Sequence, residues 1–173
     1  TRVIMLNTSD LYDLTAEEIS AGYGGQVNGG NIDGCFISAT QLTWLVSLLA
    51  ANKGESITNT VLLTHPPLDW GTVFKQNNMA QLLEIVRDYN AGNSGSVTAA
   101  KGETISYNFS GKNTAPLYLN IHGHLHNLRD REITVDGSGT GIYALGTPNA
   151  CLGRNSEIND NGSSTVRNTF GDW

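Results

Sequence analysis

Thr60-Val61-Leu62-Leu63-Thr64-His65-Pro66-Pro67 is the stretch of sequence that decides the fold. Its first five residues form a continuous run that is apolar at its centre and β-branched at its start. Such a run is typical of a strand buried on both faces of a parallel sheet. The two prolines end the strand, because neither can donate a backbone hydrogen bond to a neighbouring strand. A histidine therefore stands at the point where a buried strand ends.

A helix is predicted on the N-terminal side of this strand. Its apolar residues recur at i, i+3, i+4 and i+7, which makes one buried stripe: Leu42, Leu45, Val46 and Leu49. Ser38 and Gln41 precede the stripe as a capping box, in which each side chain bonds the free backbone N–H of the other residue. Gly54 is placed to end the helix.

A second helix is predicted from Met79 to Tyr89, with Gly92 closing it. Further short strands are predicted at residues 3–6, 104–109, 117–121, 133–135 and 141–145. The order strand, helix, strand, helix, strand predicts an α/β fold with parallel strands and flanking helices. The last short strands are expected to pair antiparallel at one edge or in a second sheet.

The remaining segments are predicted to be irregular. Residues 7–31 are polar and Gly-rich, which predicts a long loop with a helical turn near residues 16–19. Residues 155–173 have little to bury and are expected to be a weakly ordered tail. No internal domain boundary is visible, so residues 1–173 are interpreted as part of one domain.

The composition narrows the class of protein. The chain has 173 residues, 39% of them apolar and only 15% charged, and its formal net charge is −6. Without a basic stripe it does not resemble a non-specific nucleic-acid binder, although bound cations would still allow a phosphate substrate. No run spans a membrane and no signal peptide is visible, so a cytoplasmic protein is expected. Cys35 and Cys151 predict two reduced thiols rather than a disulfide framework.

The four histidines all follow predicted strands: His65, His122, His124 and His126. Sites in open α/β sheets form at the carboxyl ends of the strands, so two histidine segments are expected at one edge. His124 and His126 are two residues apart and point to one face in extended backbone, and Gly123 before them is expected to relieve crowding. Together with His65 they predict a divalent-metal site.

Each histidine motif taken alone is weak, because a histidine after a strand is more often a hydrogen-bonded structural residue. The coincidence of both motifs, with no histidine elsewhere, favours a metal site. His122 is out of phase and is assigned a structural or supporting role. Arg129 and Asp69 are candidate substrate-binding residues, with a surface arginine and a solvated carboxylate as the simpler interpretations.

These residues resemble the C-terminal half of a calcineurin-like metallophosphoesterase. That family carries, in order, Asp-x-His, Gly-Asp, Gly-Asn-His-Asp/Glu, a lone histidine after a strand, and Gly-His-x-His. His65 resembles the lone histidine, and Gly123-His124-Leu125-His126 matches the last motif. The helix that carries Gln41, Trp44 and Leu45 is similar to the Gln-x-x-Trp-Leu segment of the family.

The resemblance implies a two-sheet α/β sandwich and a metal-dependent phosphomonoester or phosphodiester hydrolase. It implies two divalent metal ions, Mn, Fe or Zn, with His65 and His124 on one ion and His126 on the other. The metal pair would polarise phosphoryl oxygens and supply a bridging hydroxide.

The three aspartate-containing motifs of the family are absent from this chain. We therefore expect an N-terminal half of the domain to be missing, and expect the chain alone not to turn over substrate. The missing half is one expected partner, and a second copy of the chain, paired through the exposed part of the sheet, is another.

Two other functions remain open at this stage. A non-catalytic binding or structural module on the same scaffold would also suit the Gly-, Asn-, Ser- and Thr-rich loops. A protein with one metal ion, held by His65, His124, His126 and an oxygen ligand, would need no second half.

Overall fold

The structure, a computed structural model, describes most of the chain. The described residues are 1–10, 13–28, 31–52, 55, 57–69, 77–111, 116–123, 129–135, 138–147, 155–158 and 164–167. Within the strands at 25–28, 31–34, 129–131, 134–135, 138–140, 155–158 and 164–167, the backbone alone is described.

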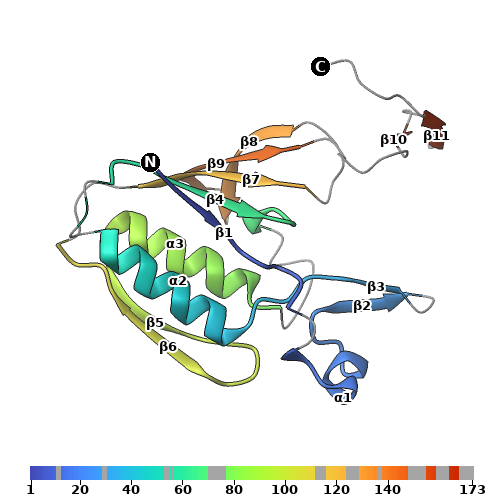
Figure 1. Ribbon diagram of the computed structural model, residues 1–173, viewed down its shortest axis with the longest axis horizontal. Helices are drawn as coiled ribbons and strands as arrows, with labels where there is room; N and C mark the ends of the chain where they lie inside the picture. Colours follow the sequence, from blue (N-terminus) through green and yellow to red (C-terminus); the bar gives the residue numbers. More distant parts are fainter. Residues whose placement is uncertain are drawn as a thin grey trace.

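The largest sheet among the described residues has five strands, and we call it the central sheet (Figure 1). Its strands, in spatial order, are β1 (Arg2–Met5), β4 (Thr60–Thr64), β7 (Leu117–His122), β9 (Ser138–Gly146) and β8 (Arg129–Val135). The first four strands run parallel to one another, and β8 pairs antiparallel with β9 at the edge. The predicted α/β class, with mostly parallel strands and an antiparallel edge, is confirmed.

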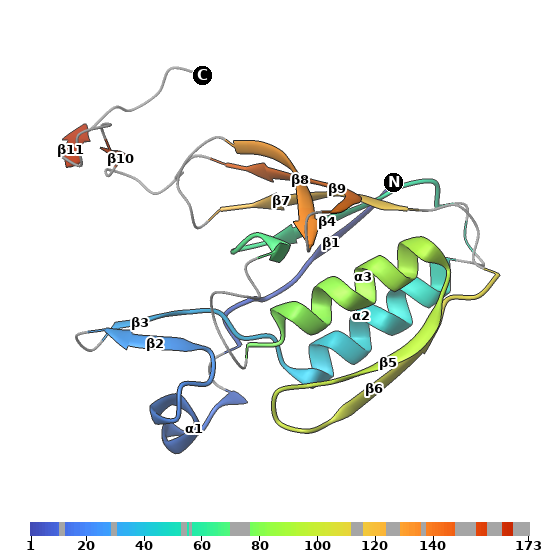
Figure 2. The same ribbon diagram turned by 180° about the vertical axis from the view of Figure 1, so that it is seen from behind.

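Two helices cover one face of this sheet, α2 (Ala39–Ala51) and α3 (Met79–Ala91), and both views place them on the same side (Figures 1 and 2). The apolar stripe of α2 is buried as predicted. Gly92 closes α3 in the left-handed region, at φ 72°, where a side chain would be strained. Gly54, the predicted end of α2, lies outside the described residues, and the helix ends at Ala51.

A β-hairpin forms a third layer on the far side of the helices (Figure 1). It consists of β5 (Ser94–Thr98) and β6 (Thr104–Asn108). The sequence predicted β6, whose alternate residues are buried, but not β5, because Ser94-Gly95-Ser96 has no apolar pattern. Phe109, just after β6, packs edge-on against Tyr89 of α3, with ring centroids 5.2 Å apart.

The helical turn predicted near residues 16–19 is confirmed as a short helix, α1 (Ala16–Ser20). The rest of the predicted loop is more ordered than expected, because it contains β2 (Gly25–Asn28), which pairs with β3 (Asn31–Gly34). Thr15 and Glu18 form a capping box at the start of α1, with each side chain bonded to the other residue's backbone N–H. Polar side chains that bond their own backbone thus build structure where the apolar pattern predicts none.

The capping box predicted for α2 is only half correct. The Ser38 hydroxyl does accept from the Gln41 N–H, at 3.2 Å. The Gln41 amide turns away, however, and donates to the Asp10 carboxylate at 2.6 Å. Asp10 also accepts from the Ser38 backbone N–H, at 3.4 Å. A buried carboxylate is a stronger acceptor than a neutral amide and takes the place predicted for Gln41.

Two short strands fall in the predicted tail, β10 (Asn155–Ile158) and β11 (Ser164–Arg167), and they pair antiparallel. The rest of residues 155–173 lies outside the described residues, so weak order there stays a prediction. None of the described helices combines the length and the hydropathy needed to span a membrane.

Candidate metal centre

The carboxyl ends of the sheet strands meet at one edge. The register aligns Thr64 at the end of β4 with His122 on β7, and His122 with Gly146 on β9. Gly146 in turn pairs with Arg129, the first residue of the antiparallel strand β8. The predicted convergence of the two histidine segments at one edge follows from this register.

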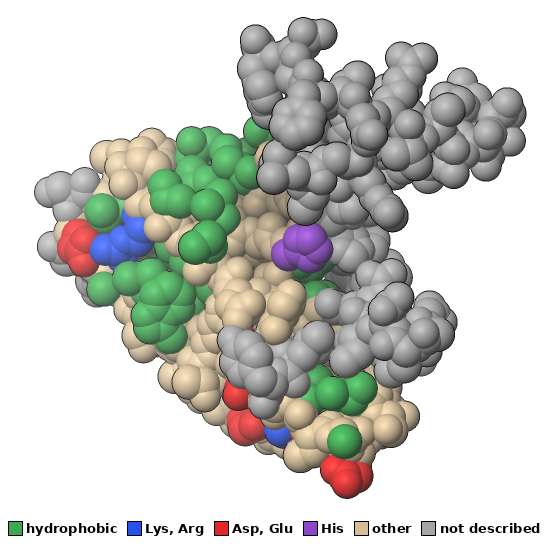
Figure 3. Space-filling model, turned by 45° about the vertical axis from the view of Figure 1, so that its right-hand side comes forward, with side chains coloured by type: hydrophobic (Ala, Val, Ile, Leu, Met, Phe, Trp, Pro, Cys, Tyr) green, Lys and Arg blue, Asp and Glu red, His purple; other side chains and the backbone are tan. Residues whose placement is uncertain are grey.

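His65 lies at this edge with an exposed side chain, and Figure 3 shows a histidine ring at the molecular surface. Its backbone is fixed on both sides. The His65 N–H donates to the Thr8 hydroxyl at 3.1 Å, and the His65 carbonyl accepts from the Gly123 N–H at 3.0 Å. The exposed side chain is thus carried by a backbone that is bonded to the segments following both neighbouring strands, β1 and β7.

Gly123 lies directly against His65. A Cβ atom added at Gly123 would stand 3.7 Å from His65 Nδ1 and 3.9 Å from the His65 carbonyl oxygen, which are ordinary contact distances. Gly123 is also not among the residues with a positive φ. The predicted relief of crowding is therefore not required within the described residues. What Gly123 does is bring the start of the Gly-His-x-His segment into contact with His65.

His124 and His126 themselves lie outside the described residues. For Arg129 the backbone alone is described, and it sits at the same register level as His122 and Gly146. Asp69 is half-buried in the short turn after Pro67. The structure thus gathers His65 and the backbones of the Gly123 and Arg129 segments at one edge, and the roles of these residues stay predictions.

His122 belongs to the inner side of the sheet. It is only 2% exposed, and its Nδ1 lies 3.1 Å from the Gly123 carbonyl oxygen. Its own carbonyl accepts from the Thr147 N–H at 2.7 Å, which joins the ends of β7 and β9. This burial agrees with the structural role assigned to His122 from its phase.

Asn120 is a supporting residue that the sequence analysis missed. Its side chain is fully buried, donates to the Thr64 hydroxyl at 2.8 Å and accepts from the Leu68 N–H at 3.3 Å. Thr64 extends this hydrogen-bond network to the loop, because its hydroxyl donates to the Pro66 carbonyl at 2.6 Å. These bonds hold the loop that follows His65. The sequence did contain a signal for this role: Asn120 is a single amide side chain in an otherwise apolar strand, and a buried polar group needs hydrogen-bond partners.

One described side chain, that of His65, could serve as a metal ligand. An exposed imidazole such as that of His65 suits Zn, Mn or Fe as a nitrogen ligand. Among the side chains that the structure describes, no three from His, Cys, Asp and Glu are grouped closely enough to hold a metal ion. The remaining ligands of such a site would have to include His124 and His126 together with oxygen donors.

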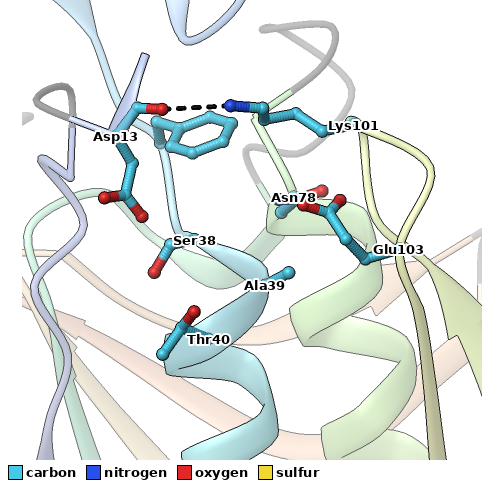
Figure 4. Close-up of a pocket in the computed structure, with 8 residues that line it drawn as sticks. Asp13, Ser38, Ala39, Thr40, Asn78, Lys101 and Glu103 are labelled. Carbon is cyan, nitrogen blue, oxygen red and sulfur yellow. Dashed lines mark hydrogen bonds between the residues drawn. The ribbon is translucent and has the colours of Figure 1, made fainter.

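A separate cavity of about 250 Å³ opens at the N-terminus of α2 (Figure 4). Asp13, Lys101 and Glu103 line it, and the Lys101 ammonium donates to the Asp13 carbonyl at 3.1 Å. None of the predicted metal ligands that the structure describes lines this cavity. It is therefore distinct from the edge that carries His65.

Cys35 is not a nucleophile in this fold. The thiol is 2% exposed, and burial raises its pKa to about 11, against a weaker opposing effect of the hydrogen bond from Asn77. A thiol that stays protonated at neutral pH attacks poorly. Cys151 lies outside the described residues.

Comparisons of this chain with family models, with curated proteins and with solved structures found no match.

Proposed function

We propose that this chain carries the histidine ligands of a two-metal phosphoester hydrolase. His65 and His124 would bind one divalent ion and His126 the other. The observation that supports this proposal is the bond from the Gly123 N–H to the His65 carbonyl, at 3.0 Å. It joins the two histidine segments at the carboxyl edge of a mostly parallel sheet, which is where open α/β sheets bind their ligands.

The ions, Mn, Fe or Zn, would polarise a phosphoryl oxygen and lower the pKa of a bound water. The side chains of this protein would bind the ions and orient the substrate. His65 presents a nitrogen donor from a backbone held by Thr8 and Gly123. Arg129, which begins β8 at the same edge, would bind phosphate oxygens through its planar guanidinium group. Asp69, in the turn after Pro67, would be a second substrate-binding residue.

The proposed fold is the two-sheet sandwich of calcineurin-like phosphoesterases. In that arrangement a second sheet would cover the face of the central sheet that α2 and α3 leave open. The same layer would bring the carboxylates that two metal ions need, since three imidazoles leave a two-metal site short of bridging oxygen ligands.

The test is an assay of the full-length gene product. It measures hydrolysis of an aryl phosphomonoester and of an aryl phosphodiester with Mn²⁺, Fe²⁺ or Zn²⁺ added. The proposal predicts metal-dependent turnover that is lost on chelation and reduced at least about a hundredfold by His65→Ala or by His124→Ala. Asn59→Ala, at the opposite end of the sheet, is the matched control and should keep full activity.

Two outcomes would count against the proposal. One is an encoded chain that stays inert toward both substrates with every metal. The other is turnover that His65→Ala and His124→Ala leave unchanged, because the activity would then arise elsewhere on the molecule.

A further inference from the structure

A buried carboxylate lies two residues after Thr8 in the chain, and the proposed function does not use it. Asp10 is 7% exposed, and among the described residues no lysine, arginine or histidine pairs with it. Neutral donors surround its charge instead. The Asn7 amide donates to Asp10 Oδ1 at 2.7 Å, and the Gln41 amide donates to Asp10 Oδ2 at 2.6 Å. The Ser38 hydroxyl, at the start of α2, also donates to Oδ2, at 3.0 Å.

A buried charge holds its donors in place more strictly than a neutral group does. Removing a carboxylate from water is costly unless its oxygens accept hydrogen bonds, and such bonds are roughly twice as strong as those between neutral groups. The dipole of α2 also favours a negative charge at its N-terminus. Moving Asn7 or Gln41 would leave Asp10 short of a donor. The segment after β1 and the start of α2 are therefore tied to one point.

Gln41 extends this restraint to the backbone that follows β1. Its side-chain carbonyl accepts from the Asn7 N–H at 2.6 Å, and its NH₂ group donates to the Asn7 carbonyl at 2.8 Å. One side-chain amide thus pairs with both backbone groups of Asn7. The Phe36 N–H donates to the Thr8 carbonyl at 3.0 Å, and the Phe36 carbonyl accepts from the Asp10 N–H at 3.0 Å. The backbone is therefore held on both sides of Thr8.

Thr8 connects this network to the proposed metal centre. It is 2% exposed, and its hydroxyl accepts from the His65 N–H at 3.1 Å. We propose that Asp10 is a positioning residue of the centre. It fixes the segment around Thr8 and, through the Thr8 hydroxyl, the backbone from which His65 presents its imidazole. This role rests on the proposed function, in which His65 binds a metal ion.

The first test needs no metal. Hydrogen exchange of the His65 amide, followed by NMR with EDTA present, reports whether the Thr8 hydroxyl still accepts from it. Asp10→Asn keeps the shape of the side chain but replaces an acceptor oxygen by a donor, so the network loses a bond. The His65 amide should then exchange at least about tenfold faster relative to the amides of β4. A loss of global stability alone would speed both sets of amides equally.

The second test is titration of the chain with Co²⁺. The affinity should fall severalfold in Asp10→Asn, as in Thr8→Val. The double variant should bind as weakly as either single variant and no more weakly, because Asp10 acts through the Thr8 hydroxyl, whereas two independent effects would multiply. Asn52→Ala, a buried substitution at the start of the parallel strands, is the matched control. It should lower stability and leave both the exchange ratio and the affinity unchanged.

Gln41→Met tests the same role at a half-buried position, where the fold should tolerate the change. It keeps the length of the side chain and removes both bonds to Asn7 as well as the bond to Asp10. The variant should reproduce both effects of Asp10→Asn, and circular dichroism checks that each variant folds.

Two results would overturn the role of Asp10. One is a His65 amide whose exchange relative to β4 is unchanged in both Asp10→Asn and Gln41→Met. The other is a pair of affinity losses, in Asp10→Asn and Thr8→Val, that multiply in the double variant. A parent chain that binds no Co²⁺ contradicts the proposed function instead, and the amide exchange then decides alone whether Asp10 positions His65.

Discussion

The two ends of the central sheet use the same kinds of hydrogen bond for different results. At the amino end, buried Asn52 donates to the Tyr89 hydroxyl at 2.9 Å and accepts from Arg2 of β1. At the carboxyl end, Thr8 and Asn120 instead bond the backbone of the loop that starts at His65. The amino end thus joins helices to strands through side chains, whereas the carboxyl end holds a loop and leaves its imidazole at the surface.

This difference between the two ends separates hydrogen bonds that only stabilise the fold from hydrogen bonds that also position the proposed site. A polar group that bonds another buried side chain contributes to the free energy of folding alone. A polar group that bonds the backbone beside His65, the proposed metal ligand, contributes to folding and, under the proposal, also fixes the position of that ligand. Substitutions at the two ends should therefore differ in their effect on metal affinity more than in their effect on stability.

The largest loss of stability is expected from Asn52→Ala at the amino end. The variant leaves the Tyr89 hydroxyl and the Arg2 guanidinium each short of one buried partner, which lowers the free energy of unfolding by about 3 kcal/mol. Metal affinity should not change. Urea denaturation and metal titration measure the two effects. Asn59→Ala, which removes a solvent-exposed bond to Thr58, is the control and should stay within about 0.5 kcal/mol of the parent chain.

A smaller loss of stability with a loss of metal affinity is expected from Asn120→Ala. The free energy of unfolding falls by about 2 kcal/mol, because the Leu68 N–H and the Leu62 carbonyl lose their buried side-chain partner. Metal affinity falls about tenfold, since the loop after His65 is no longer held. The same denaturation and titration experiments apply. Unchanged metal affinity in a destabilised Asn120→Ala protein would break the contrast between the two ends.

Thr8→Val tests one bond at the carboxyl end with almost no change in shape. The His65 N–H loses its acceptor, which lowers the free energy of unfolding by about 1 kcal/mol and weakens metal binding severalfold. Calorimetric titration with Zn²⁺ measures the affinity. The matched control is Thr58→Val, at an exposed position near the amino end, and an equal effect on metal binding there would contradict the account.

The smallest effect is expected at α1, which follows the carboxyl end of β1. The hydrogen bond from the Thr15 backbone N–H, and then the Lys101 ammonium at 2.9 Å, lower the pKa of Glu18. The contribution of Glu18 is therefore present above its unfolded pKa of about 4.3 and is lost as the pH falls through the lower folded value. Hydrogen exchange of the α1 amides should show local opening as the pH falls below the unfolded value.

Glu18→Gln should remove this acid response, whereas Glu17→Gln, on the same helix, should keep it. Global unfolding should change little in both variants, because the ion pair between Glu18 and Lys101 lies near the surface, where such a pair contributes little to the free energy of unfolding. An acid response that survives in Glu18→Gln would show that another group holds α1.

Much of the fold follows from local pattern. The apolar run at 60–64 and the stripe of α2 are visible in the sequence because burial on a strand or a helix face imposes a period. The meeting of His65 and Gly123 also follows, since parallel neighbours bring their carboxyl ends together.

The rest depends on partners that are distant in the chain. Gln41 leaves its predicted place because Asp10, 31 residues away, reaches the start of α2. His65 is held by Thr8, which is 57 residues away. The strand β5 carries little apolar signal, and it forms because β6 pairs with it and α3 packs against it. Such contacts belong to the folded chain and not to any window of sequence.

The central claim is that His65, His124 and His126 form one metal centre at the carboxyl edge. Its most direct test is titration of this chain with Co²⁺, followed by its visible absorption, beside the His124→Ala/His126→Ala double variant and His65→Ala. The account predicts binding to the parent chain that weakens at least about tenfold in both variants and is unchanged in Asn59→Ala. Co²⁺ binding that is equally strong in the double variant, or absent from the parent chain, would contradict it.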